Sequence, residues 1–214
     1  MCCEFFRNLR VRFVNHRENG LFPTLERVRL ALMDHAFFAR DAVFVAKELI
    51  GMEFRFHNAG GIIVETEAYR PDDPASHSFN GPTPRNRVMF GPPAHLYVYR
   101  SYGIHWCANL VCTSGSAVLI RALEPTTGLD LMKLRRGTEV LRSLCSGPGK
   151  LCQALGITGE ADGLSAIESP VLLRTRDRQP DILEGPRIGI SKAMELPWRF
   201  GFKGSPSLSK PFKK

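Results

Sequence analysis

The sequence predicts an α+β fold in a single domain. Its apolar segments are short and are separated by Gly, Pro, Asn and Ser, which is typical of antiparallel strands joined by tight turns. Helical patterns are grouped in the middle of the chain and do not alternate regularly with the strands, which argues against a doubly wound parallel sheet. The 214 residues can bury one core but are few for two.

The first expected element is a helix within RDAVFVAKELIG, residues 40–51. Asp41 suits the N-cap because its carboxylate can accept a hydrogen bond from a free backbone N–H, and Gly51 suits the C-terminal stop. The apolar face is predicted to comprise Ala42, Val45, Ala46 and Leu49. The folded domain therefore begins near this helix.

Strands are expected next, followed by helices. The strand patterns cover residues 52–56, 61–69, 95–100, 105–112 and 116–123. Apolar spacing of three and four residues then predicts helices at 128–136, 138–144 and 150–156, the last closed by Gly156. Two further strands are expected within residues 169–175 and 186–191.

The ends of the chain differ from its body. Residues 1–35 are rich in arginine and lack the apolar stretch of a signal peptide, so we expect a flexible basic arm there, with a targeting role as the weaker alternative. The expected domain spans residues 36–209, and a short basic tail spans 210–214.

Charge and cysteine content restrict the partners and the compartment. A net charge of +8 points to a polyanion, most simply nucleic acid, although a basic but inert surface would give the same value. The six cysteines form no C-x-x-C pair, and four of them fall on apolar faces, which favours buried free thiols in a reducing compartment. No apolar run approaches the length of a membrane span, so we expect no membrane partner.

Two carboxylates share one face of the strand within IIVETEAY. Side chains alternate along a strand, so Glu65, Glu67 and Tyr69 lie on one face and Val64, Thr66 and Ala68 on the other. On this segment alone, a solvated acidic face is the stronger interpretation, and a catalytic wall is the alternative.

The segment HLYVYRSYGIHWCANLVC predicts a β-hairpin with an aromatic tip. The strand faces would carry Tyr97 and Tyr99 on one side of the turn and His105, Cys107 and Asn109 on the other. Tyr102 and Ile104 would then lie at or near the tip, where they could wedge between DNA base steps or pack back on the sheet.

Arg121 lies inside the apolar strand AVLIRALEP. A buried guanidinium requires an acid or a strong hydrogen-bond partner, so the sequence implies a carboxylate nearby. Glu67 is a natural candidate, and a structural ion pair with Glu65 or Glu124 would satisfy the same requirement.

Two loops could contact phosphate. Arg85 and Arg87 lie in TPRNR, and Lys150 lies in SGPGK just before a predicted helix, where free backbone N–H groups attract anions. The second loop does not match the nucleotide-binding P-loop pattern. Zinc-hydrolase, zinc-deaminase, nucleophilic-serine and dinucleotide motifs are also missing from the sequence, so we expect no metal and no cofactor.

Taken together and in order, VETEAY, ASHS, TPRNR, LYVYRSYG, CANL, LIRALEP and LCSGPGKLCQALGI closely resemble the alkyladenine (3-methyladenine) DNA glycosylase family. The resemblance runs from about residue 37 to residue 209. It implies a single mixed domain with a curved antiparallel sheet and a β-hairpin that enters the minor groove. It also implies hydrolysis of the bond between a flipped, alkylated or deaminated purine and its deoxyribose, leaving an abasic site.

The resemblance further assigns roles to residues. Glu67 matches the general base that activates water, and Arg121 matches its partner. Tyr69, His77, Tyr99 and Asn109 match the base pocket. Tyr102 matches the residue that fills the gap left by the flipped nucleotide, with Ile104 beside it. The partner implied is double-stranded DNA containing damaged purines, bound by a monomer.

The sequence leaves two other functions open. The charge and the aromatic tip alone would also suit a damaged-DNA-binding module without catalysis, and an RNA-processing hydrolase could present a similar basic surface. For a bacterial protein we expect a cytoplasmic, nucleoid-associated location, with a nuclear or organellar location as the alternative.

Overall fold

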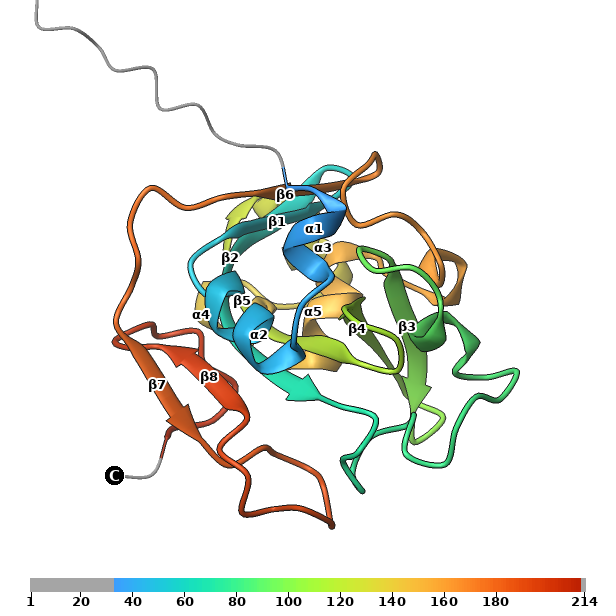
Figure 1. Ribbon diagram of the computed structural model, residues 1–214. Coiled ribbons are helices and arrows are strands. Elements are labelled where there is room, and N and C mark those ends of the chain that lie inside the picture. The colour runs from blue at the N-terminus through green and yellow to red at the C-terminus, as the bar shows by residue number, and fades with distance from the viewer. Residues whose placement is uncertain (1–32, 213–214) are drawn as a thin grey trace, which may run out of the picture.

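A computed structural model describes residues 33–212, which fold around one curled antiparallel sheet (Figure 1). The sheet has eight strands, of which six follow the order β3-β4-β5-β2-β1-β6, while β8 pairs with both β2 and β7. The strands are β1 (Glu53–Phe56), β2 (Ala59–Tyr69), β3 (Leu96–Ser101), β4 (His105–Val111), β5 (Ala117–Thr127), β6 (Val171–Arg174), β7 (Ile182–Gly185) and β8 (Arg199–Phe202). The expected α+β class with a curved antiparallel sheet is confirmed.

The long central strand β2 organises the sheet. Its first part pairs with β1, its last part pairs with β8, and β5 runs along its other edge. Gly61 permits this close pairing, because a Cβ there would lie 2.1 Å from the Glu124 carbonyl oxygen. The register with β5 shifts on both sides of Glu65, which marks an irregularity at the first of the two carboxylates.

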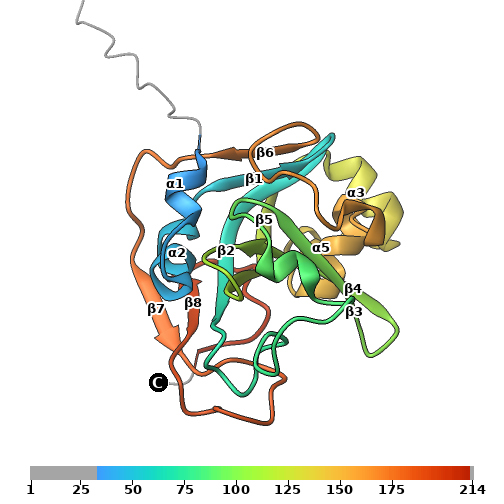
Figure 2. The ribbon, with the colours of Figure 1, turned by 45° about the vertical axis from the view of Figure 1, so that its right-hand side comes forward.

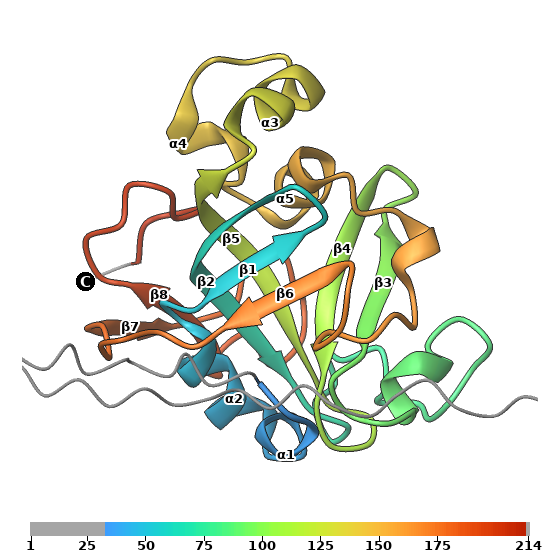
Figure 3. The same ribbon diagram turned by 90° about the horizontal axis from the view of Figure 1, so that it is seen from above.

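The described residues also form five α-helices and two short 3-10 helices. They are α1 (His35–Phe38), α2 (Ala42–Leu49), α3 (Leu129–Arg136), α4 (Leu141–Leu144), α5 (Pro148–Leu155), η1 (Arg87–Phe90) and η2 (Gly159–Ala161). In Figure 3, α1 and α2 lie below the sheet and α3 and α4 above it, while α5 packs against β4 and β5. Apolar side chains of α2, α5 and the central strands share one continuous core.

The predicted N-cap of α2 and the predicted end of α5 are confirmed. Asp41 caps α2 by accepting a hydrogen bond from the Val43 N–H at 2.8 Å, and the predicted apolar face is buried. Gly156, in the left-handed conformation, ends α5 as expected. The helix expected over 138–144 is wrong in extent, because α4 occupies only Leu141–Leu144.

The strand expected within residues 186–191 is wrong. This segment is a loop, and the last two strands are β7 before it and β8 after it. The Ile188 N–H donates to the Glu67 side chain and not to a neighbouring strand, which explains why an apolar alternating pattern does not form a ladder here.

The hairpin of β3 and β4 is formed as expected, and its turn projects from the body of the molecule (Figure 2). Tyr102 and Gly103 both have positive φ in this turn. Cys107, Cys112, Cys145 and Cys152 are buried free thiols, as predicted, while Cys2 and Cys3 lie outside the described residues.

Most of the expected arm, residues 1–32, and the last two residues of the expected tail also lie outside the described part of the chain. Between residues 33 and 212, no helix has the length and apolar character to cross a membrane.

Candidate active site

A cavity of about 870 Å³ opens between the hairpin, the start of α5 and the loop after Arg187. The end of β2 supplies Tyr69 and the middle of β5 supplies Arg121. The strands β3 and β4 supply Tyr97, Tyr99, Cys107 and Asn109. The sheet therefore brings together side chains that are far apart in the sequence.

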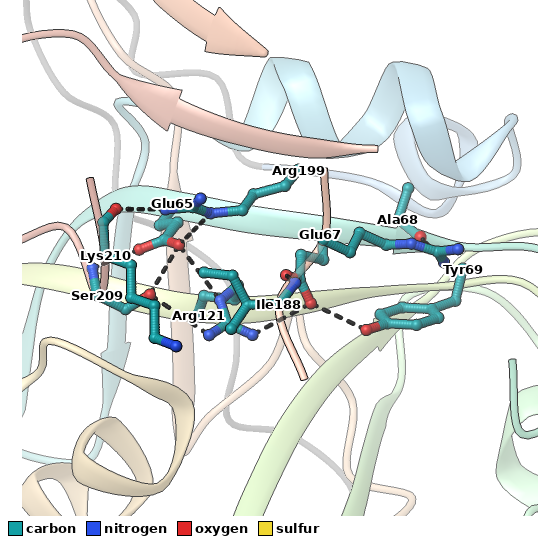
Figure 4. Close-up of polar contacts among 10 residues, drawn as sticks. Glu65, Glu67, Ala68, Tyr69, Arg121, Ile188, Arg199, Ser209 and Lys210 are labelled. Atoms are coloured by element: carbon teal, nitrogen blue, oxygen red, sulfur yellow. Dashed lines mark hydrogen bonds and ion pairs between the residues drawn. The ribbon is translucent and has the colours of Figure 1, made fainter. Parts of the chain in front are cut away.

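Glu67 lies directly behind the cavity wall and has no exposed surface. Its polar partners are drawn in Figure 4. Its Oε2 accepts hydrogen bonds from the Tyr69 hydroxyl at 2.9 Å and from Arg121 Nη1 at 3.2 Å. Its Oε1 accepts one from the Ile188 N–H at 2.7 Å. All three donor residues line the cavity, and a carboxylate has about four acceptor positions, so Glu67 retains about one for a further donor such as water.

Glu65 is equally buried but has more partners. Arg121 Nε lies 3.2 Å from its Oε1, and Arg199 Nε lies 2.7 Å from the same oxygen. Ser209 donates its N–H to Oε2 at 2.5 Å and its hydroxyl to Oε1 at 2.8 Å. Since neither Arg199 nor Ser209 lines the cavity, Glu65 lies farther from it than Glu67 and serves to hold Arg121.

Strand pairing explains why this charge cluster is buried. Glu65 and Glu67 lie where β2 is flanked by both β5 and β8, and Glu67 is directly opposite Arg199. Two buried carboxylates and two buried guanidiniums balance one another, which offsets the cost of removing each from water. The solvated-face interpretation of this strand is therefore wrong. Arg121 contacts both Glu67 and Glu65, whereas Glu124 is bound by Ser205.

The surroundings of Glu67 shift its pKa in opposite directions, and burial has the largest effect. Desolvation raises the pKa of this carboxyl above its ordinary value of 4.5, because it outweighs the opposing effects of Arg121, the Ile188 N–H and the Tyr69 hydroxyl. Burial and the neighbouring Glu67 raise the pKa of Tyr69 well above its ordinary value, so this phenol stays protonated and donates to Glu67.

The rings of Tyr97, Tyr99 and His77 also line the cavity. The rings of Tyr97 and Tyr99 are stacked with centroids 5.5 Å apart, and His77 packs edge-on against Tyr99 at 4.4 Å. His77 Nδ1 lies 2.9 Å from the Tyr97 hydroxyl. Burial, and then the nearby Arg85, lower the pKa of His77, which favours a neutral imidazole. The loop from residue 70 to residue 77 thus brings His77 to the cavity, and Tyr97 is an additional wall residue.

Asn109 is nearly buried at the base of the hairpin. Its side-chain amide Nδ2 donates to the Tyr97 carbonyl oxygen at 2.9 Å, which fixes its orientation within the cavity wall. The remaining carbonyl oxygen of the side chain is then available to a molecule in the cavity.

The hairpin tip is exposed, so packing back on the sheet is excluded for its two apolar residues. Tyr102 is 85% exposed and Ile104 is 67% exposed. Tyr102 also lines the mouth of the cavity, whereas Ile104 does not. A large aromatic side chain held in water beside a cavity is typical of a contact surface.

Basic side chains surround this mouth. Arg85 and Lys150 line the cavity as exposed residues, while Arg87 begins η1 away from the lining. Arg136 and Lys192 are additional basic residues in the lining that the sequence did not reveal. Together they give the opening a positive charge suited to a polyanion.

Sequence patterns did not reveal several residues that hold the site. Arg187, Ile188, Arg199 and Ser209 all follow residue 185 and contact the β2 carboxylates or the strand carrying them. The sequence offered one signal, because Arg187 lies inside the apolar run PRIGIS and a buried guanidinium requires an acid or a strong hydrogen-bond partner nearby. For Ser209, we find no signal in the sequence.

The arrangement can support hydrolysis beside a flat aromatic ligand. A carboxylate with one remaining acceptor position could orient a water, and Arg121 holds that carboxylate in place. The tyrosine rings offer π-faces that attract a planar group, more strongly if it is cationic. Residues 33–212 contain no group of His, Cys, Asp and Glu side chains suited to a metal ion.

Comparison with known proteins identifies the family. Residues 36–206 match the sequence profile of Methylpurine-DNA glycosylase (MPG). A protein of Agrobacterium fabrum is 67% identical over 178 residues, covering 83% of this chain and 92% of that protein. One from Rhodopseudomonas palustris is 61% identical over 184 residues, covering 85% and 89%. One from Nitrosospira multiformis is 58% identical over 180 residues, covering 82% and 93%.

Each of these relatives carries the name "Putative 3-methyladenine DNA glycosylase". The matched residues include β2, the hairpin and β5, and so contain the carboxylate pair, the aromatic wall and Arg121. The chain therefore belongs to the methylpurine-DNA glycosylase family, and is an enzyme of the class that hydrolyses N-glycosyl bonds in DNA.

Proposed function

We propose that this protein is a monofunctional DNA glycosylase of base excision repair that acts as a monomer on double-stranded DNA. It flips alkylated or deaminated purines, such as 3-methyladenine, 7-methylguanine and hypoxanthine, out of the duplex. It then hydrolyses the N-glycosidic bond and leaves an abasic site. The observation that carries this proposal is the position of Glu67 immediately behind the aromatic cavity, with one acceptor position remaining.

The pocket chemistry favours an electron-poor purine. A purine alkylated at N3 or N7 is positively charged, and the π-faces of Tyr69 and Tyr99 would attract it more than a neutral base. The lowered pKa of His77 supports this preference, because a neutral imidazole does not repel a cation. Asn109, fixed by its bond to the Tyr97 carbonyl, would contact the edge of the base.

In the proposed reaction, Glu67 removes a proton from water as the water oxygen bonds to C1′ of the deoxyribose. The electrons of the N-glycosidic bond pass to the purine. A 3- or 7-alkylated purine leaves as a neutral base and needs no acid, whereas hypoxanthine needs a proton. The ionised Glu67 would also stabilise the positive charge that develops on the sugar as the bond breaks. No lysine contacts Glu67 in the described part of the chain, and the two lysines of the lining, Lys150 and Lys192, are exposed residues. Strand cleavage through a Schiff base is therefore not part of the proposal.

The exposed hairpin tip supports base flipping. Tyr102 is the most exposed large apolar side chain among the described residues and lies at the cavity mouth, where it could fill the space left by the flipped nucleotide. The basic residues around the mouth would contact the phosphates on either side.

The test is release of free 3-methyladenine from alkylated duplex DNA by wild type and by Glu67→Gln. We expect wild type to release the base and the variant to lose about 10²-fold to 10⁴-fold in rate, as for loss of a general base. Both proteins should melt cooperatively, so that a loss of rate is not a loss of folding. Equal release by the two proteins would remove Glu67 from the mechanism.

A second candidate is a damaged-DNA-binding module without catalysis. The complete burial of Glu67 favours it, because water must enter the cavity wall to reach the carboxylate. The same experiment separates the two candidates. Tight binding to a lesion duplex by wild type with no abasic product after long incubation would support the binding module.

A further inference from the structure

The ion pair between Asp73 and Arg187 lies outside the cavity lining, yet it joins the segments that carry the site. Both side chains are fully buried. The pairing is bidentate, since Arg187 Nη1 bonds to Asp73 Oδ2 and Nη2 lies 3.0 Å from Oδ1. A bidentate arginine pair fixes orientation as well as distance.

Arg187 is hydrogen-bonded to the backbone of β2 at the residue between Glu67 and Tyr69. Its Nη1 donates to the Ala68 carbonyl oxygen at 3.0 Å, and Ala68 separates Glu67 from Tyr69. Its guanidinium carbon lies 4.7 Å from the centroid of the Tyr69 ring. Because Tyr69 lines the cavity and Arg187 does not, the guanidinium supports the side of the ring away from the cavity.

The same arginine positions a donor to Glu67. It immediately precedes Ile188, whose N–H binds Glu67 Oε1 at 2.7 Å. Its Nη2 also donates to the Ala193 carbonyl oxygen at 3.4 Å, on the far side of the same loop. The loop that supplies the N–H is thus attached to β2 through one side chain.

Asp73 connects this arrangement to the base-pocket loop. Its Oδ1 accepts from the Ala75 N–H at 3.0 Å, which shapes the turn that leads to His77. The ion pair therefore joins the His77 loop, the end of β2 and the Ile188 loop.

The guanidinium of Arg187 is held by stacking as well as by hydrogen bonds. Arg187 Nε is the buried side-chain nitrogen without a hydrogen-bond partner in the described part of the chain. Leaving a buried donor unpaired is costly, so the hydrogen bonds of Nη1 and Nη2 and the stack on Tyr69 and Trp198 together hold the guanidinium in a position that leaves Nε without a partner.

We propose that Arg187 and Asp73 are positioning residues, which hold Tyr69 and the Ile188 N–H in register with Glu67 during base excision. This inference rests on the proposed function. An ordinary structural ion pair would contribute to folding alone, whereas this pair would also set the rate of the chemical step and the pH at which Glu67 acts.

The test uses Arg187→Lys, which keeps the charge but loses the planar fork, and Asp73→Asn, which keeps the size but loses the charge. Leu173→Ala in β6 is the matched control, since it opens a core defect away from the cavity. All proteins are assayed below their unfolding transitions, with enzyme in excess over a 3-methyladenine duplex.

We expect both pair variants to lower the rate of base release at saturating enzyme by about 10²-fold, as small misplacements of reacting groups do. The Ile188 N–H lowers the pKa of Glu67, so its loss should also move the acid limb of the pH-rate profile to higher pH. The Leu173→Ala control should be less stable but should keep the wild-type rate of base release and the wild-type acid limb of the pH-rate profile.

Amide hydrogen exchange at Ile188 gives a readout that does not need activity, and it should be faster in both pair variants than in the control. If wild type releases no base, the proposed function fails, and this exchange rate decides the positioning role alone. The proposal would be overturned if Arg187→Lys and Asp73→Asn lost stability as Leu173→Ala does but kept the wild-type rate of base release. The acid limb of the pH-rate profile and the amide exchange at Ile188 would then also be unchanged.

Discussion

Arg121 Nη1 lies 3.2 Å from Glu67 Oε2, and the other end of the same guanidinium, Nε, lies 3.2 Å from Glu65 Oε1. One side chain on β5 thus separates two carboxylates on β2 into different surroundings. Glu67 faces the cavity through its donors, while Glu65 is enclosed by Arg199 and Ser209. The two carboxylates should therefore respond differently to substitution.

Glu65→Gln should reduce stability strongly. The substitution removes the negative charge that two buried guanidiniums share, and breaking a buried ion pair costs about 3–5 kcal/mol. The free energy of unfolding, measured by urea titration, checks this. The matched control is Glu124→Gln on β5, where the exposed carboxylate contacts Ser205 and the change should stay within about 0.5 kcal/mol. Equal stabilities for the two variants would contradict the structural role of Glu65.

Base release should increase as pH rises through the raised pKa of Glu67. The carboxyl must be ionised to accept a proton from water, and burial holds its pKa above 4.5. The measurement is the single-turnover rate for 3-methyladenine release against pH. A rate that is flat across the acid range in wild type would contradict the assignment.

The raised pKa of Glu67 predicts the opposite pH dependence for stability. A carboxyl whose pKa is higher in the folded than in the unfolded state binds more protons when folded, so its contribution to stability falls as pH rises between the two pKa values. Comparing the pH dependence of unfolding for wild type and Glu67→Gln isolates this contribution. Between the two pKa values, the unfolding free energy of wild type should therefore fall relative to that of Glu67→Gln as pH rises.

Tyr102→Ala should weaken binding to lesion duplex without affecting the fold. The side chain is 85% exposed, so its removal should change the unfolding free energy by no more than about 0.5 kcal/mol. Binding should suffer because a flipped nucleotide leaves a gap that alanine cannot fill. Fluorescence anisotropy with lesion duplex measures the effect. Phe44→Ala on α2 is the control, as another exposed aromatic residue, 67% exposed, that does not line the cavity.

Lys150→Ala should flatten the salt dependence of DNA binding. Each phosphate contact releases about 0.9 counterion, so the slope of log K against log salt should fall by roughly that amount. Lys203→Ala provides the comparison, since Lys203 is exposed, pairs with Asp181 and does not line the cavity. An identical slope for wild type and Lys150→Ala would place Lys150 off the DNA surface.

The fold was predictable where local patterns agree with tertiary pairing. Alternation along β2 and β3 placed Glu67 and Tyr99, because successive side chains of a strand point to opposite faces. The turn pattern between β3 and β4 placed Tyr102. The burial of the two carboxylates was not predictable from that strand alone. It depends on Arg121 and on Arg199, which comes from a four-residue strand with little local signal.

For residues 186–191, the local pattern predicted a strand that the structure does not contain. Its apolar alternation resembles a strand, but the Ile188 N–H is used by a side chain and Arg187 turns inward to Asp73. A single sequence cannot show such contacts, because they join residues more than a hundred positions apart. The family resemblance thus predicted Tyr69, His77, Tyr99 and Asn109 of the lining. Ile188 in the lining, and Arg187, Arg199 and Ser209 behind it, were not predicted.

The contact between Ser209 and Glu65 spans 144 positions of the chain. During synthesis, β2 and β5 leave the ribosome long before Ser209, so their carboxylates and Arg121 can meet while two of the donors to Glu65 are still missing. The charge cluster is then incomplete at the time when the sheet is otherwise able to close. Completion of the charge cluster around Arg121 therefore depends on a segment that is among the last to be synthesised.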